Sequence, residues 1–323
     1  SVTFGGSGTT LDQTSGLVVT NGADSATIDV SAAETVEDLL NELNGAGLSL
    51  QADINAAQTG LDVRSRLSGA SFSIGENGGA TATQLGIRSY TEASRLADFN
   101  RDVGVLTNPG ADLRITAGDT SFFDVDLSGA LTVDDVLNAI NSNPGNGGRI
   151  TAQLATVGNG IELIDNTGGP NPLIVERLNG SQAGHLLGFL PDGQDSISSA
   201  TAQLQSEDRN LQEVDSVFNS LLRLRTAVIE NDPAAIGREI DRLDVDLVRA
   251  LFAQAEVGAR EQALAVLDQR LQDEEVQLRS VLSENIDVDL VEAITNLTAR
   301  QFALQASLQT TASLLRLSVL DFI

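Results

Sequence analysis

The chain has 323 residues and a formal net charge of -26, and arginine is its only basic residue apart from one histidine. So acidic a chain is not expected to bind nucleic acid or insert into a membrane, because cationic side chains carry binding to nucleic acid and to anionic lipid. It has no cysteine and only 3% aromatic residues, which excludes disulfides and argues against a large aromatic ligand pocket. No run reaches the roughly 20 consecutive apolar residues that a membrane-spanning helix needs.

Residues 1–16 have neither a cationic start nor an apolar run, so they do not resemble a cleaved signal peptide. Because the sequence begins with Ser1 rather than Met, we expect this segment to be a linker, or the remnant of a missing N-terminal part.

A repeat follows, in which TVEDLLNELN at 35–44 returns as TVDDVLNAIN at 132–141. Shorter matches flank both copies in the same order. They are LVVT at 17–20 with LRIT at 113–116, TGLDV at 59–63 with NGIEL at 159–163, and LGI at 85–87 with LGF at 187–189. We therefore predict two similar modules, 17–107 and 108–195.

Each module has the pattern of a small α+β unit. Alternating apolar residues at 27–30 and at 123–127 predict half-buried strands. Thr35 and Thr132 each precede an aspartate by three residues, which predicts a capping box at the start of a short helix. The apolar stripe of that helix can then lie on the strands.

From residue 196 onward the sequence favours helix, and we assign 196–282 to a helical rod domain. A first helix is expected from Leu211 to Ile229. Asp232 and Pro233 then form the start of a helix of about 50 residues, since Pro is favoured at the first helical position. We expect that helix to end in a break at 283–289.

The segment 283–323 is expected to be a terminal helix that mediates assembly. Its apolar residues alternate at spacings of four and three, which is the pattern of a coiled-coil seam interrupted by Gln301 and Thr311. An apolar chain end usually indicates a covering partner. The predicted assembly residues are Leu290, Ile294, Leu297, Leu304, Leu308, Leu315, Leu320, Phe322 and Ile323.

Several stretches of this half resemble flagellins and flagellar hook-associated proteins, most closely those at the hook–filament junction. They are AEVGAR at 255–260, LDQRL at 267–271, DLVEAITNL at 289–297, QASL at 305–308 and the terminal LDFI. The two modules resemble the hook IN repeat of the same family. The resemblance covers 17–189 loosely and 200–323 more specifically.

The resemblance implies a structural subunit of the bacterial flagellum that has no enzymatic activity and no cofactor. Such a protein is extracellular and is exported without a cleaved signal peptide. It associates with itself, with other axial proteins such as flagellin and hook-associated proteins, and with an export chaperone. It also implies a long coiled-coil-like helical stalk beneath a β-rich, multidomain α+β head. Residues expected to pack within the rod are Val257, Gly258, Arg260, Leu264, Leu267 and Leu271.

Two alternatives stay open at this stage. A flagellin that forms the filament itself shares the helical ends, and a surface adhesin or glycan-binding module would use the β-rich head. The single histidine, His185, lacks the companions that a zinc site needs. The Asp-x-Asp pairs at 124–126, 244–246 and 287–289 fit no calcium loop. We therefore expect no catalytic or metal site.

Overall fold

The computed structural model describes residues 10–214 and 216–320, apart from the side chains of 285–289 and 317–320. The fold is mixed α+β with one long C-terminal helix, as expected. The chain divides into two compact units, residues 1–244 and 245–323.

The first half of the head is built on a sheet with strand order β2-β1-β5-β9, beside a separate β3-β4 hairpin. A buried face of β1 and β5 carries the apolar residues, and Leu17 and Val19 are completely buried there. The elements are β1 (Leu17–Asn21), β2 (Asp24–Ile28), α1 (Val36–Gly45), β3 (Leu50–Ile54), β4 (Leu61–Ser65), β5 (Phe72–Asn77) and α2 (Thr81–Leu85).

The second half repeats this arrangement. Its sheet has the order β12-β11-β6-β7, and a second sheet has the order β13-β10-β8. The elements are η1 (Leu96–Asp98), α3 (Phe99–Asp102), β6 (Leu113–Thr116), β7 (Phe122–Val125), α4 (Val133–Asn141), β8 (Ile150–Leu154), β9 (Val157–Gly158), β10 (Ile161–Asp165), β11 (Leu173–Arg177), α5 (Ala183–Leu186), β12 (Ser196–Ser199) and β13 (Gln203–Gln205).

The repeated sequences occupy equivalent places in the two halves. In each half an antiparallel hairpin (β1-β2 or β6-β7) precedes a helix, a second hairpin follows, and a further strand (β5 or β11) returns to pair with the first strand. Both predicted capping boxes are confirmed: Thr35 accepts from the Asp38 amide at 3.1 Å, and Thr132 accepts from the Asp135 amide at 3.4 Å. Identical local chemistry therefore starts both helices.

The two halves have separate hydrophobic cores. The first is formed from residues between Leu17 and Ile87, and the second from residues between Tyr90 and Leu204. The segment from Tyr90 to Phe99, which we placed in the first module, thus packs in the second core.

The expectation of helix from residue 196 is wrong for its first part, because Ser196–Ser199 and Gln203–Gln205 are edge strands of the two second-half sheets. Polar edge strands such as these are held by backbone hydrogen bonds to the neighbouring strand, and in β13 the buried side chain of Leu204 adds a contact with the core.

The two halves share a sheet through β9. Val157 and Gly158 belong to the second half by sequence but pair with Asn77 and Glu76 of β5. A Cβ on Gly75 would lie 2.4 Å from the backbone of Gly158, so only glycine permits this approach. Near this strand, the side-chain amide of Asn159 donates to the backbone carbonyl of Ile74 and to the carboxylate of Asp208. The two halves are therefore joined by backbone pairing as well as by the chain.

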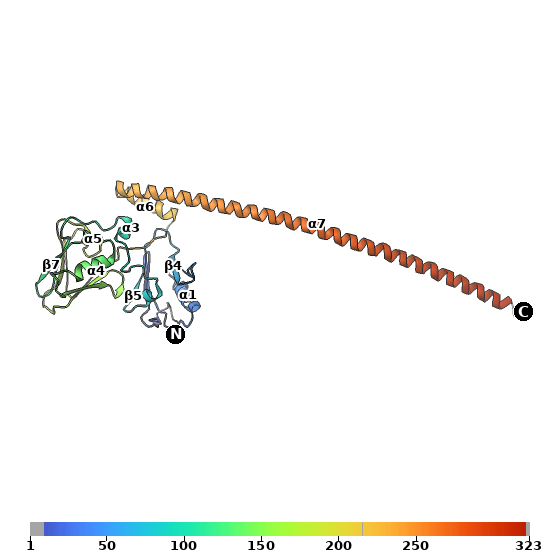
Figure 1. Ribbon diagram of the computed structural model, residues 1–323, viewed down its shortest axis with the longest axis horizontal. Coiled ribbons are helices and arrows are strands. Elements are labelled where there is room, and N and C mark those ends of the chain that lie inside the picture. Colours follow the sequence, from blue (N-terminus) through green and yellow to red (C-terminus); the bar gives the residue numbers. More distant parts are fainter. Residues whose placement is uncertain (1–9, 215, 321–323) are drawn as a thin grey trace. The chain divides into compact units, whose positions relative to one another are not determined.

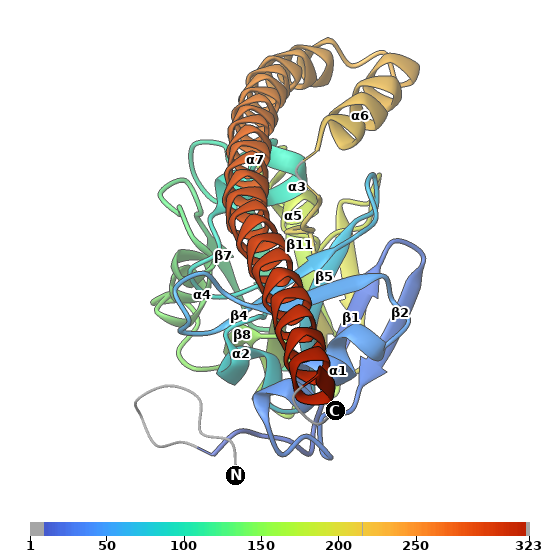
Figure 2. The ribbon, with the colours of Figure 1, turned by 90° about the vertical axis from the view of Figure 1, so that its right-hand side faces the viewer.

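Two helices complete the chain, α6 (Val217–Ile229) and α7 (Pro233–Leu320), and a tight turn connects them (Figures 1 and 2). The α6 helix starts later than expected, since Gln212 instead forms a bridge with Phe72 of β5. The predicted start of α7 is confirmed: the side chain of Asp232 accepts from the amides of Ala234 and Ala235, both at 3.0 Å.

The α7 helix runs for 88 residues without interruption, so the break expected at 283–289 is wrong. That stretch contains no proline and no glycine, and weak helix formers such as Ser, Asn and Asp each cost only about 0.7 kcal/mol or less. At about 1.5 Å per residue the helix is roughly 130 Å long.

Candidate assembly surface

Large apolar side chains on α7 are solvent-exposed along most of its length. The residues expected to pack in the rod, Val257, Leu264, Leu267 and Leu271, have exposed fractions of 51% to 65%. An amphipathic helix that is unpaired on all sides cannot derive its stability from burial, which is the usual source of helix stability in proteins. These positions therefore form an exposed apolar surface on the described part of α7.

The terminal part of α7 carries the regular seam predicted from sequence. Its residues, Leu290, Ile294, Leu297, Leu304, Leu308 and Leu315, are 54% to 63% exposed. A spacing of four and three keeps them on one helix face. Of the predicted assembly residues, Leu320 ends the helix without a described side chain, and Phe322 and Ile323 lie outside the described residues.

Three further large apolar residues, outside the predicted seam, are exposed on this part of the helix. Val291, Phe302 and Leu314 are 62% to 66% exposed. Only Glu292, Arg300 and Arg316 are charged between 290 and 316, in a chain whose net charge is -26. A helix with so few charges around its circumference is typical of one that is covered on more than one side.

Two residues of the expected rod packing behave differently from the apolar ones. A Cβ on Gly258 would meet no atom of the described residues within 4 Å. Arg260 forms an ion pair with Glu256, one turn earlier on the same exposed helix face. Such exposed pairs stabilise a helix by about 0.5 kcal/mol or less.

The α6 helix also presents an apolar face to solvent. Val217, Phe218, Leu221, Val228 and Ile229 are 42% to 67% exposed, which is unusual for a helix of 13 residues. Leu222 is the point of contact with the first half of the head, since its side chain packs against the backbone of Gly69. The rest of the α6 face has the character of a partner surface.

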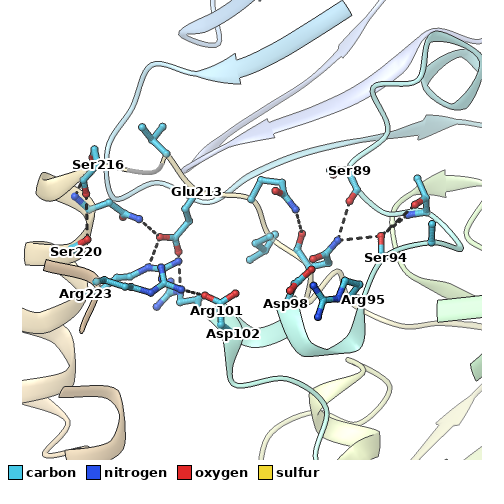
Figure 3. A pocket seen from close by; sticks show the side chains of 18 residues that line it. Ser89, Ser94, Arg95, Asp98, Arg101, Asp102, Glu213, Ser216, Ser220 and Arg223 are labelled. Carbon is cyan, nitrogen blue, oxygen red and sulfur yellow. Dashed lines mark hydrogen bonds and ion pairs between the residues drawn. The ribbon is translucent and has the colours of Figure 1, made fainter. Parts of the chain in front are cut away.

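A cluster of buried charges anchors α6 and the start of α7 to the head (Figure 3). Glu213 lies at its centre with a side chain only 6% exposed, and it accepts hydrogen bonds from Arg223 at 2.6 Å and from Asn219 at 2.7 Å. Arg101 pairs with the same carboxylate at 3.0 Å, and Arg223 also lies 3.7 Å from Glu239 of α7. The cluster thus joins four separate parts of the chain.

An unusual backbone turn in the head positions the head residues of this cluster. Asn100, Arg101 and Asp102 have φ angles of 53°, 60° and 63°, in the left-handed region that L-residues avoid at a cost of about 1 kcal/mol or more each. Asn100 is held there by its amide, which donates to the carbonyl of Arg209, and by its side chain, which donates to Leu186. The turn aims Arg101 at Glu213 and Asp102 at Arg242.

Burial raises the pKa of Glu239, and the nearby Arg223 only partly opposes this effect. One oxygen of Glu239 and one guanidinium nitrogen of Arg223 are buried without a hydrogen-bond partner. The negative charge on Glu239 therefore lowers the stability of the folded protein.

A cleft of about 480 Å³ is lined by the charged side chains of Arg101, Asp102, Glu213, Arg223 and Arg242. Three of the four arginines that line it pair with carboxylates of the cleft: Arg101 and Arg223 with Glu213, and Arg242 with Asp102. We interpret the cleft as a structural joint between the head and the helices. Sequence reasoning missed it because the head residues Arg101 and Asp102 lie more than 100 positions before their partners, Glu213 and Arg242.

The aspartates at 124 and 126 and His185, considered from sequence, have partners or surroundings that the structure describes, whereas the side chains of 287–289 lie outside the described residues. Asp124 pairs with Arg114 at 2.7 Å and Asp126 accepts from the amide of Ser128, so both serve local structure. His185 lies in α5 with its Nδ1 buried and unpaired. Across the described residues, no three metal-ligating side chains come close enough to hold an ion, and no helix is long and apolar enough to cross a membrane.

Comparisons with models of known protein families, with curated proteins and with solved structures each found no match to this chain.

Proposed function

We propose that this chain is a structural subunit of the bacterial flagellum that assembles through its long C-terminal helix. The observation that carries the proposal is the row of large apolar side chains on α7, each more than half exposed and regularly spaced from Leu290 to Leu315. The resemblance of 200–323 to flagellins and hook-associated proteins supports the flagellar assignment. Its terminal LDFI favours the hook–filament junction over the filament.

The magnitude of burial indicates what kind of assembly this surface supports. Fully covering an exposed Leu or Ile contributes about 1.5–3 kcal/mol, so the six described seam residues, about 60% exposed, would contribute about 5–10 kcal/mol. Association itself costs about 4–15 kcal/mol in lost freedom. A partner helix that buries a similar apolar face of its own can therefore offset this cost, and the exposed residues outside the seam leave apolar area for further neighbours.

The head fits the outward part of such a subunit. Its two halves have their own buried cores and are joined by the β5-β9 pairing. The buried charges around Glu213 fix α6 and the first turns of α7 to it. A stiff connection of this kind suits a protein whose role is mechanical.

Sedimentation of the purified chain tests assembly through α7. Replacing Leu297 and Leu304 by Asn should remove the concentration-dependent association of the wild-type chain, because both side chains lie on the seam. A matched double variant on the face opposite the seam, Ala299→Asn with Ala306→Asn, should associate like the wild type. A wild-type chain that stays monomeric at high concentration, or seam variants that associate normally, would contradict the proposal.

A further inference from the structure

The outward face of α6 has the residue spacing of a short coiled-coil seam with one positive charge in it. Phe218, Leu221, Arg225 and Val228 follow one another at intervals of three, four and three, and all four are exposed. The apolar members are 66%, 49% and 58% exposed, in chain order. Residues 217–229 include two arginines and no carboxylate, in an otherwise acidic chain.

The middle of α7 has the opposite pattern. Val257, Leu264, Leu271 and Leu278 recur every seven residues and are 55% to 69% exposed. One flank of this row, four residues after each member, is occupied by the carboxylates Glu261, Asp268 and Glu275, and the other flank holds Arg260, Leu267 and Glu274. Seven residues correspond to about 10.5 Å along the helix, so an acidic group flanks the apolar row once every two turns.

This middle segment is poorly suited to pairing with a second copy of itself. Two such seams in parallel register would place carboxylates opposite one another, and like charges at these positions are unfavourable. Residues 245–284 contain eight carboxylates and four arginines, a net charge of 4 - 8 = -4. The segment thus needs an apolar partner that carries positive charge.

We propose that α6 of one subunit packs against residues 257–278 of α7 in a second copy of this chain, with Arg225 facing Glu261 or Asp268. The two faces match in spacing, in apolar character and in charge. The inference rests on the proposed assembly function and adds a second contact, distinct from the seam at 290–315. The repeat of the acidic row allows neighbouring seven-residue registers, which a polymer can exploit without a new surface.

The lack of cysteine in the chain allows this contact to be tested by cross-linking. Two differently tagged, full-length copies are mixed and mildly oxidised, one with Leu221→Cys on α6 and the other with Leu264→Cys on α7. The proposal predicts a disulfide dimer that carries both tags. Dimers that carry only the Leu221→Cys copy would show that α6 pairs with itself and would overturn it.

Charge reversal tests the pairing of Arg225. Adding Arg225→Glu to the α6 copy should lower the yield of mixed dimer about fivefold, since an attraction between exposed charges becomes a repulsion. Adding Glu261→Arg and Asp268→Arg to the other copy should restore it. Asp273→Arg lies on another face of α7 and serves as the control. Added to the α7 copy in place of the two reversals, it should leave the yield within about twofold of that obtained with Arg225→Glu alone.

A mixed yield that is unaffected by Arg225→Glu, or a restoration equally produced by Asp273→Arg, would refute the contact. Circular dichroism of each variant verifies that the helices are retained. If the Leu297 and Leu304 variants abolish association while Arg225→Glu changes no cross-link, this inference fails and the proposed function stands. If the wild-type chain never associates, both fail.

Discussion

Replacing Glu213 by Gln is the sharpest test of how the helices are anchored to the head. Gln keeps the size of the side chain but removes the charge that faces Arg223, whose side chain is only 11% exposed. Removing one partner of a buried ion pair costs about 3–5 kcal/mol. Because Arg223 keeps Glu239 at 3.7 Å, we expect the lower end of that range, about 3 kcal/mol.

Hydrogen exchange of the backbone amides of α6 measures this cost directly, because local opening is governed by the free energy of the joint. At about 1.4 kcal/mol per tenfold change, Glu213→Gln should speed exchange in Leu221–Ile229 about 100-fold. Glu256→Gln removes the same charge from an exposed pair with Arg260 and should change exchange around it less than about fivefold. Exchange in α6 that changes less than about threefold in Glu213→Gln would refute the anchoring role.

Two other predictions concern the same joint and the contact between the head halves. Burial raises the pKa of Glu239 in the folded protein. The negative charge of Glu239 therefore opposes folding above that raised pKa, and it has no effect below the ordinary pKa of about 4.3, where the group is protonated in both states. Glu239→Gln should accordingly slow hydrogen exchange of the α6 amides at pH 7 and leave it unchanged near pH 4. Gly75→Ala would place a Cβ 2.4 Å from the Gly158 backbone, and should lower the urea stability of the head by about 1–3 kcal/mol, measured through fluorescence of the single tyrosine. Gly129→Ala, which meets no atom within 4 Å, should be close to neutral in the same assay, and equal effects of the two changes would contradict the packing argument.

Local chemistry was the part of the fold that could be predicted from sequence. The capping residues Thr35 and Thr132 and the helix start at Pro233 depend on neighbours within three residues, and all were found as predicted. The repeated motifs also occupy equivalent strands and helices, because the same apolar spacing buries the same faces.

The errors arose where distant parts of the chain override local propensity. The polar stretch from Ser196 to Gln205 has little strand character of its own, yet β10 and β11 provide its hydrogen-bond partners. Leu211 belongs to a helical stripe by spacing, but Gln212 beside it pairs with Phe72 across the head.

The candidate surface was more predictable than the joint beside it. Exposed seam residues such as Leu297 are readable from periodicity alone. Glu213, Arg101 and Glu239 have no such signal, because only the folded chain brings them together. The exposed face of α6 could not be predicted from sequence either, because it is set by the contact of Leu222 with Gly69 in the folded head.

The central claim is that this chain is built into the flagellum outside the cell, and labelling of living cells tests it most directly. A single exposed cysteine, introduced by Thr201→Cys in the head, can be reacted with a membrane-impermeant fluorescent maleimide, because the chain has no other thiol. We predict one discrete spot at the base of each filament, whereas label along the whole filament would instead favour the flagellin alternative. Cells whose flagella carry no label, while the protein is found elsewhere, would contradict the account.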